Sequence, residues 1–200
     1  SLIGDGILIP GEWATFTIDV AGGVGADVHG WLDLNRNGTW DAGEDFLHRY
    51  NVTGQQVVSY LVPQNAQPGA TYARFRVVAH NENWTPSPWG LAQSGEVEDY
   101  LYTVRAIDYG DAPWSYRTLR EYDGARHLIN MTGPYLGQIV DHDVDGIPSV
   151  GADSDDLLDL SDDEDGVTFS SLLWIGYDGG DAAYRAYYDV VAPNGGVLDV

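Results

Sequence analysis

The sequence predicts an all-β protein, and two observations carry that prediction. Short runs of β-branched and aromatic residues recur along the chain, and clusters of Gly, Pro, Asn and Asp separate them. No window of a dozen residues has the apolar periodicity of a helix. We therefore expect strands at residues 14–20, 28–34, 57–62, 71–79, 100–106, 167–174 and 183–191, arranged as a sandwich or a barrel.

The composition excludes several classes of function. The chain has 200 residues, with 31 Asp and Glu against nine Arg and no Lys, and its formal net charge is −22. Such a surface offers no basic footprint to nucleic acid or to an anionic membrane. No run of apolar residues is long enough to span a bilayer. The lack of Cys excludes disulfides, thiolate zinc sites and a Cys nucleophile. We therefore expect no nucleic-acid partner and no direct membrane insertion.

The C-terminal part of the chain resembles its beginning. Asp5-Gly6-Ile7 is similar to Asp165-Gly166-Val167, and residues 13–20 are similar to residues 183–190, each run being followed by a Gly-rich turn. Residues 31–34 are in turn similar to residues 197–200. These matches occur in the same order, which indicates that a second repeat starts near residue 166.

The repeat divides the chain into three expected parts. Residues 1–106 are expected to form one sandwich, residues 107–165 an acidic connecting segment, and residues 166–200 the first strands of an incomplete second sandwich. Half a sandwich leaves apolar strands uncovered. We expect the following chain or another subunit to complete it, so that the partners are neighbouring repeats or identical subunits.

Residues 33–44 have the spacing of a calcium-binding loop. Oxygen-bearing side chains stand at positions 1, 3, 5, 9 and 12, Gly stands at position 6, and position 7 offers its backbone carbonyl. Ca²⁺ takes six to eight oxygens, which such a tight turn can gather. The alternative is an ordinary Asn-Gly turn, which explains residues 37 and 38 alone. The expected ligands are Asp33, Asn35, Asn37, Thr39, Asp41 and Glu44.

A second acidic stretch covers residues 141–165, where eleven residues are acidic and none is Arg. Its opening repeats the D-x-D-x-D-G spacing, but no Glu follows at position 12. A flexible acidic linker is the alternative, although apolar residues are interleaved with the acids. We expect at least one Ca²⁺ here, bound by ligands drawn from Asp141, Asp143, Asp145, Ile147, Asp153 and Asp155.

Several of these motifs together resemble the GEVED repeat domain. The name-giving signature is Gly95-Glu96-Val97-Glu98-Asp99-Tyr100, and residues 31–38 and 68–76 also fit. Further along, Asp108-Tyr109-Gly110-Asp111-Ala112-Pro113 and residues 161–167 are similar to the segment that often accompanies this domain. The resemblance implies an antiparallel, Ig-like β-sandwich in a large secreted or cell-surface protein of bacteria or archaea. It implies a structural or adhesive role and no catalytic residues.

Charged residues near the signature predict ion pairs between neighbouring strands. Arg74 and Arg76 alternate along one expected strand, so both lie on one face. We expect them to pair with Glu96, Glu98 or Asp99 of the adjacent strand. Separate solvated charges of little energetic weight are the alternative.

The sequence favours a non-enzymatic module that Ca²⁺ stabilises, working outside the cell in an adhesin stalk, a surface fibre or a filament. It contains no nucleophile elbow, zinc-protease helix or phosphate-binding loop. The runner-up is a carbohydrate-binding module, because Trp84 and Trp89 stand in a Pro-rich loop and could stack on sugar rings. A halophile surface would explain the missing Lys but not the loop spacing.

Overall fold

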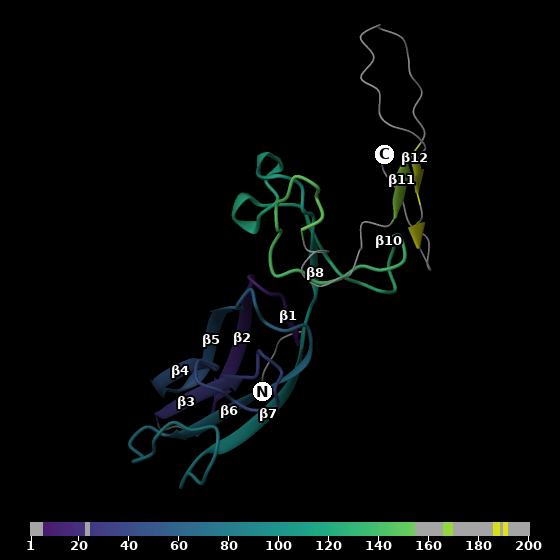
Figure 1. Ribbon diagram of the computed structural model, residues 1–200. Helices are drawn as coiled ribbons and strands as arrows, with labels where there is room; N and C mark the ends of the chain where they lie inside the picture. The colour runs from purple at the N-terminus through teal and green to yellow at the C-terminus, as the bar shows by residue number, and fades with distance from the viewer. Residues whose placement is uncertain (1–5, 23–24, 155–165, 170–185, 189, 192–200) are drawn as a thin grey trace, which may run out of the picture. The chain divides into compact units, whose positions relative to one another are not determined.

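The computed structural model describes residues 6–22, 25–154, 166–169, 186–188 and 190–191 (Figure 1). The chain divides into two compact units, Ser1–Ala106 and Ile107–Val200, and each is considered by itself. Within the described residues, no helix has the length and apolar character needed to cross a membrane.

The first unit is built on a five-stranded sheet with the strand order β1-β7-β6-β3-β4. Four of these strands pair antiparallel, whereas β1 runs parallel to β7 and pairs Ile7 with Thr103. The expected sandwich was antiparallel throughout, so β1 departs from it. The reason is that β1 leads across to the second sheet instead of turning back as a hairpin. The strands are β1 (Ile7–Leu8), β3 (Ala26–Leu32), β4 (Asp45–Val52), β6 (Gly69–Ala79) and β7 (Glu96–Val104).

A second, two-stranded sheet covers one face of the first. It consists of β2 (Trp13–Val20) and β5 (Gly54–Leu61), which pair antiparallel from Trp13 with Leu61 to Val20 with Gly54. Alternate residues of β2, such as Phe16 and Val20, point into the core and are buried. This alternating burial is typical of a strand that packs one face on another sheet and leaves the other face toward solvent.

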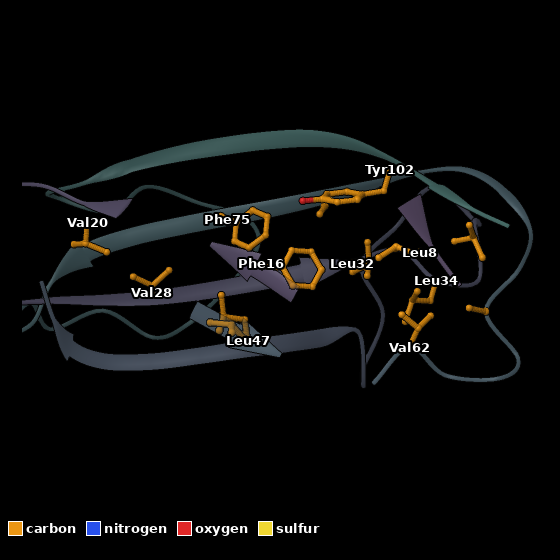
Figure 2. Close-up of a cluster of buried hydrophobic side chains, with 14 of the residues drawn as sticks. Leu8, Phe16, Val20, Val28, Leu32, Leu34, Leu47, Val62, Phe75 and Tyr102 are labelled. Atoms are coloured by element: carbon orange, nitrogen blue, oxygen red, sulfur yellow. The ribbon is translucent and has the colours of Figure 1, made fainter. Parts of the chain in front are cut away.

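Aromatic rings fill the centre of the core (Figure 2). The ring of Phe16 lies 5.1 Å from that of Phe46 and 5.7 Å from that of Tyr102, measured between ring centres. Phe75 meets Phe46 edge-on at 5.6 Å. Tilted and edge-on contacts at these distances stabilise a core beyond the effect of burial alone.

The second unit has short elements joined by long connections. Strands β8 (Ile107–Tyr109) and β9 (Arg126–Leu128) pair antiparallel, and two 3₁₀ turns, η1 (Trp114–Tyr116) and η2 (Arg120–Tyr122), lie between them in sequence. Strand β10 (Tyr135–Leu136) pairs with β13 (Val190–Val191), and β11 (Val167–Phe169) pairs with β12 (Ala186–Tyr188).

The two stretches that resemble each other in sequence pair differently in the described residues. In the first unit, residues 7–8 and 13–20 belong to different sheets. Their counterparts by sequence include β11 and β12, which pair directly with each other, Val167 opposite Tyr188. Whether residues 166–200 begin a second sandwich therefore stays a prediction.

The prediction of an all-β chain is confirmed, and five of the expected strands match described strands of the first unit. The sequence missed the short strands β1, β8, β9 and β10. It also missed β4, whose pairing with β3 contains register shifts at Ala26/Val28 and Gly30/Trp31 that break the polar–apolar alternation. Strand β7 begins at Glu96, so the signature is itself a strand. The expected strands at 167–174 and 183–191 lie partly outside the described residues.

Candidate functional site

The loop between β3 and β4 contains the first set of expected calcium ligands. Asp33 and Glu44, at its two ends, are both buried. Asp33 accepts hydrogen bonds from the backbone N–H groups of Asn37 (3.2 Å) and Gly38 (3.0 Å). Gly38 has a φ of +82°, a conformation that favours glycine. The carboxylate of Asp33 thus stabilises the turn that contains Gly38, which is position 6 of the predicted calcium loop.

Glu44 closes the same loop from its far end. One of its oxygens, Oε1, accepts from the backbone N–H of Leu34 at 3.0 Å and of Asn35 at 3.3 Å. The other, Oε2, accepts from the N–H of Asp41 at 2.8 Å. The carboxylate therefore links the start of the loop to its end.

Asp41 is the point at which the remaining side chains of the loop meet. Its Oδ2 accepts from the side-chain amides of Asn35 (3.0 Å) and Asn37 (2.6 Å), and its Oδ1 accepts from the hydroxyl of Thr39 (3.2 Å). These bonds, the one from Asn35 first, lower the pKa of Asp41 below its usual value. The polar side chains at positions 3, 5, 7 and 9 thus converge.

The chemistry of this donor set fits Ca²⁺, since the six residues supply three carboxylates, two amides and one hydroxyl. In the described parts of the chain, however, no three Asp, Glu or His side chains are grouped as a metal ion would require. The carboxylates of Asp33 and Glu44 instead accept hydrogen bonds from backbone N–H groups. The carboxylate of Asp41 accepts from neighbouring amide and hydroxyl side chains. The loop is an ordered oxygen-rich turn, and its metal stays a proposal.

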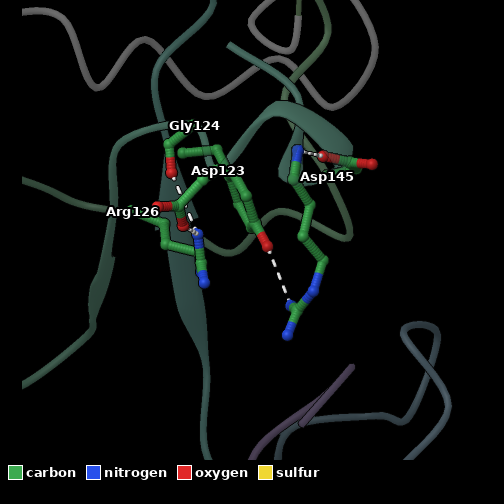
Figure 3. Close-up of polar contacts among 6 residues, drawn as sticks. Asp123, Gly124, Arg126 and Asp145 are labelled. Carbon is green, nitrogen blue, oxygen red and sulfur yellow. Dashed lines mark hydrogen bonds and ion pairs between the residues drawn. The ribbon is translucent and has the colours of Figure 1, made fainter. Parts of the chain in front are cut away.

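Two carboxylates of the second acidic stretch form hydrogen bonds with other segments of the second unit. Asp143, which is buried, accepts from the N–H of Tyr109 at 2.8 Å, and its own N–H donates to Ile107. Asp145 accepts from the N–H of Arg120 at 2.8 Å, a bond drawn in Figure 3. These two carboxylates therefore tie the stretch to β8 and to η2.

The other expected ligands of this stretch have different contacts. Ile147 donates its N–H at 2.7 Å to Asp111, a buried carboxylate that the sequence reasoning did not single out as a site residue. Asp153 accepts from the hydroxyl of Ser149 at 3.0 Å. Asp141 is half-buried, and Asp155 lies outside the described residues. The position of Asp111 in the Asp-Tyr-Gly-Asp-Ala-Pro motif was the signal that could have found it.

The two arginines of β6 have different partners. Arg74 faces Asp99 across the strands and donates from Nε and Nη2 to its two carboxylate oxygens, both at 2.7 Å. Arg76 does not pair with Glu96 or Glu98, which corrects the expectation. The register places Arg76 opposite Val97, so those glutamates project from the other face of the sheet.

Arg76 instead holds the loop that carries the two tryptophans. Its guanidinium donates to the carbonyls of Ser87 (2.8 Å), Trp89 (2.7 Å) and Gly90 (2.9 Å). Arg74 adds a bond to the carbonyl of Pro88 at 3.1 Å. Arg76 is itself buried, so the loop is bound closely against the outer face of the five-stranded sheet.

The tryptophans of this loop are in different surroundings. Trp84 packs on both Arg76, with 4.9 Å from Cζ to the ring centre, and His29, at 5.5 Å between ring centres. Trp89 contacts Trp40 at 6.1 Å but is 55% exposed. Of the two residues expected to contact a glycan, only Trp89 therefore presents a largely open ring.

Fold and site together define an all-β domain with an oxygen-rich turn between β3 and β4 and a loop held by arginines over one face of the sheet. Residues 27–103 match the model of the GEVED domain, so the chain contains a GEVED-type domain. This confirms the resemblance carried by the signature. No curated protein and no solved structure matches the chain.

Proposed function

We propose that this chain is a structural module of a large extracellular protein, such as an adhesin stalk, a surface fibre or a filament, and that Ca²⁺ stabilises it. The first unit would be an Ig-like β-sandwich, and the module would have no enzymatic activity. Its partners would be neighbouring repeats or identical subunits.

The observation that carries the proposal is the closed turn of residues 33–44. Its six oxygen-bearing side chains follow calcium-loop spacing, and those at positions 3, 5 and 7 bond the carboxylate at position 9. Asp33, Asn35, Asn37, Asp41 and Glu44 would hold the ion through side chains, and Thr39 through its carbonyl. A bound Ca²⁺ would neutralise carboxylates in a chain whose formal net charge is −22.

Melting of the full chain in calcium tests the proposal. We expect a higher melting temperature in millimolar CaCl₂ than in EDTA, and no comparable rise in MgCl₂. Binding to the folded state alone adds about 2.7 kcal/mol at free calcium 100 times the Kd. Equal melting temperatures in CaCl₂ and EDTA would contradict it.

Substitutions assign the effect to a site. Asp41→Asn keeps the side-chain shape but removes a charge, so the calcium response should fall. Asp19→Asn removes the same charge from an exposed position of β2 and should leave the response unchanged. Asp145→Asn reports on the second acidic stretch in the same way.

The alternative function, binding of an extracellular glycan, now depends on one ring. Trp89 is 55% exposed, whereas Trp84 is covered on two sides. Glycan-array binding that disappears in Trp89→Ala but persists in Trp13→Ala, another exposed Trp, would support that alternative over a purely structural role.

A further inference from the structure

A cavity of about 120 Å³ lies between β2 and β7 at one end of the core of the first unit. Its lining is mainly apolar, but two acidic residues of the signature take part in it. The residues that matter here are Ile18 and Val20 of β2, Phe75 and Val77 of β6, and Glu96 and Glu98 of β7.

The register of the sheet explains why glutamates line an apolar cavity. Glu98 lies opposite Phe75, and Glu96 lies opposite Val77. Directly opposed residues project from the same face of a sheet. Because Phe75 faces the core, both carboxylates project from the core face, toward β2. Tyr100 donates its hydroxyl to Glu98 at 2.5 Å, which orients that side chain.

The cationic side chains of the neighbouring strand do not neutralise these glutamates. Arg74 binds Asp99, and the guanidinium of Arg76 binds three loop carbonyls on the outer face. Among the residues that the structure describes, neither Glu96 nor Glu98 forms an ion pair with a cation. Asp19 and Arg76 also line the cavity, but the guanidinium of Arg76 is directed to the loop carbonyls. The cavity therefore combines an apolar floor with the carboxylates of Glu96 and Glu98, which form no ion pair among the described residues.

We propose that this cavity binds the side chain of a lysine presented by a partner protein. The four methylene groups of lysine would cover the apolar floor, and its ammonium group would lie by the two carboxylates. Residues two apart on a strand stand roughly 6.5 Å from each other, so one ammonium group can approach both glutamates. A second copy of these 200 residues cannot supply the side chain, because they include no lysine.

The strands beside the cavity favour a polypeptide as the source of the ammonium group. Among the described strands, β2 has only β5 as a neighbour, and β1 pairs with β7 only at Thr103 and Val104. Among the residues that the structure describes, no strand pairs with β7 beside the glutamates on the side opposite β6. An extended segment that carries the lysine can add hydrogen bonds there.

Titration of the ¹⁵N-labelled full chain with Nα-acetyl-lysine methylamide tests the inference. We expect saturable shifts of the backbone amides of residues 18–20 and 96–98. The norleucine analogue, which has the same hydrocarbon stem and no charge, should give none. A pentapeptide with lysine at its centre should bind about tenfold more tightly, since a tenfold change corresponds to about 1.4 kcal/mol of added contacts.

Variants separate charge from shape. Glu96→Gln combined with Glu98→Gln should weaken binding of the pentapeptide at least about tenfold. Ala21 also lines the cavity, so Ala21→Phe should block it while keeping both charges. Glu121→Gln, which removes an exposed charge in the second unit, should have no effect. Circular dichroism checks that each variant is folded.

Three results would overturn the inference: no saturable shift at millimolar ligand, equal binding of the norleucine analogue, or unchanged binding by the double variant. Equal affinities for the pentapeptide and for n-butylammonium would reject a polypeptide as the source. The calcium proposal is tested by melting, so either idea can fail without the other.

Discussion

Arg76 lies over the ring of Trp84, with 4.9 Å between its Cζ and the ring centre, while its guanidinium donates to three backbone carbonyls of the same loop. One buried cation thus fixes both the path of the loop and a side chain on it. Neutral carbonyls, not carboxylates, are its hydrogen-bond partners. This contact organises the outer face of the five-stranded sheet.

Replacing Arg76 with Lys should destabilise the protein even though the charge is kept. A lysine ammonium cannot reach three carbonyls with the geometry of a planar guanidinium. Losing hydrogen bonds between a buried cation and these part-buried carbonyls costs about 1–3 kcal/mol, and urea denaturation measures the loss. Arg49→Lys, at a position whose side chain donates only to the carbonyl of His48 among the described contacts, should change stability by less than about 0.5 kcal/mol. Equal effects would refute the special role of Arg76.

Asp99→Asn should flatten the acid limb of the stability curve. The hydrogen bonds from Arg74 lower the pKa of Asp99 in the folded state. The pair therefore contributes stability above the ordinary value of 3.8, and this is lost as pH falls through the lower folded value. Since 49% of the Asp99 side chain is exposed, we expect at most about 1 kcal/mol. Urea denaturation at pH 5 and pH 3 measures it, with Asp19→Asn as the control.

His29→Phe should remove a different pH dependence. Burial, together with the nearby positive charge of His48, lowers the pKa of His29 below 6.5. The unfolded chain then binds a proton more readily than the folded chain, so stability falls as pH drops below 6.5. The slope from this group is at most about 1.4 kcal/mol per pH unit.

Phenylalanine is suited to this position because His29 is 1% exposed and contacts the rings of Trp84, Trp31 and Tyr50. Denaturation midpoints between pH 7 and pH 5 give the comparison. His127→Phe, at an exposed site of the second unit, is the control. An unaltered slope in His29→Phe would show that another group is responsible.

Gly95→Ala should disrupt the start of the signature strand. A Cβ at residue 95 would lie 1.7 Å from the carbonyl oxygen of Val77, and the φ of +80° is itself unfavourable for alanine. Gly54 has a φ of +65° but open space around it, so Gly54→Ala isolates the conformational effect, which is about 1–2 kcal/mol. We expect the loss at Gly95 to exceed that at Gly54 by at least about 1 kcal/mol in thermal melts. A smaller difference would mean that the backbone moves to make room.

The strand content of the first unit could be predicted from the sequence because most strands alternate apolar and polar residues. Where alternation fails, so does the prediction: β4 lies beside two register shifts. The pairing of β1 with β7 could not be predicted, since residues 7–8 and 103–104 are far apart in sequence and carry no pairing signal.

The arginine contacts show the same limit at the level of the site. Asp99 was among the expected partners of Arg74, but the sequence could not choose between Asp99, Glu96 and Glu98 without the register. For Arg76 the partners are the backbone carbonyls of residues 87, 89 and 90. Every residue has such a carbonyl, so the sequence carries no signal for this contact. In the turn of residues 33–44, the side chains of Asn35, Asn37 and Thr39 bond Asp41, because a tight turn brings alternate side chains together. Asp33 and Glu44 bond backbone N–H groups instead, and the calcium ligands of this turn stay a prediction.

The signature strand divides its side chains between two opposite tasks. Asp99 and Val97 project from the face that carries the tryptophan loop, whereas Glu96, Glu98 and Tyr100 project toward β2. Inserting or deleting a single residue anywhere in this strand would exchange the two sets and bring carboxylates under the loop while turning aromatic rings to water. The length of this segment is therefore constrained as strictly as its composition, and length variation between related chains should be confined to the loops on either side of it.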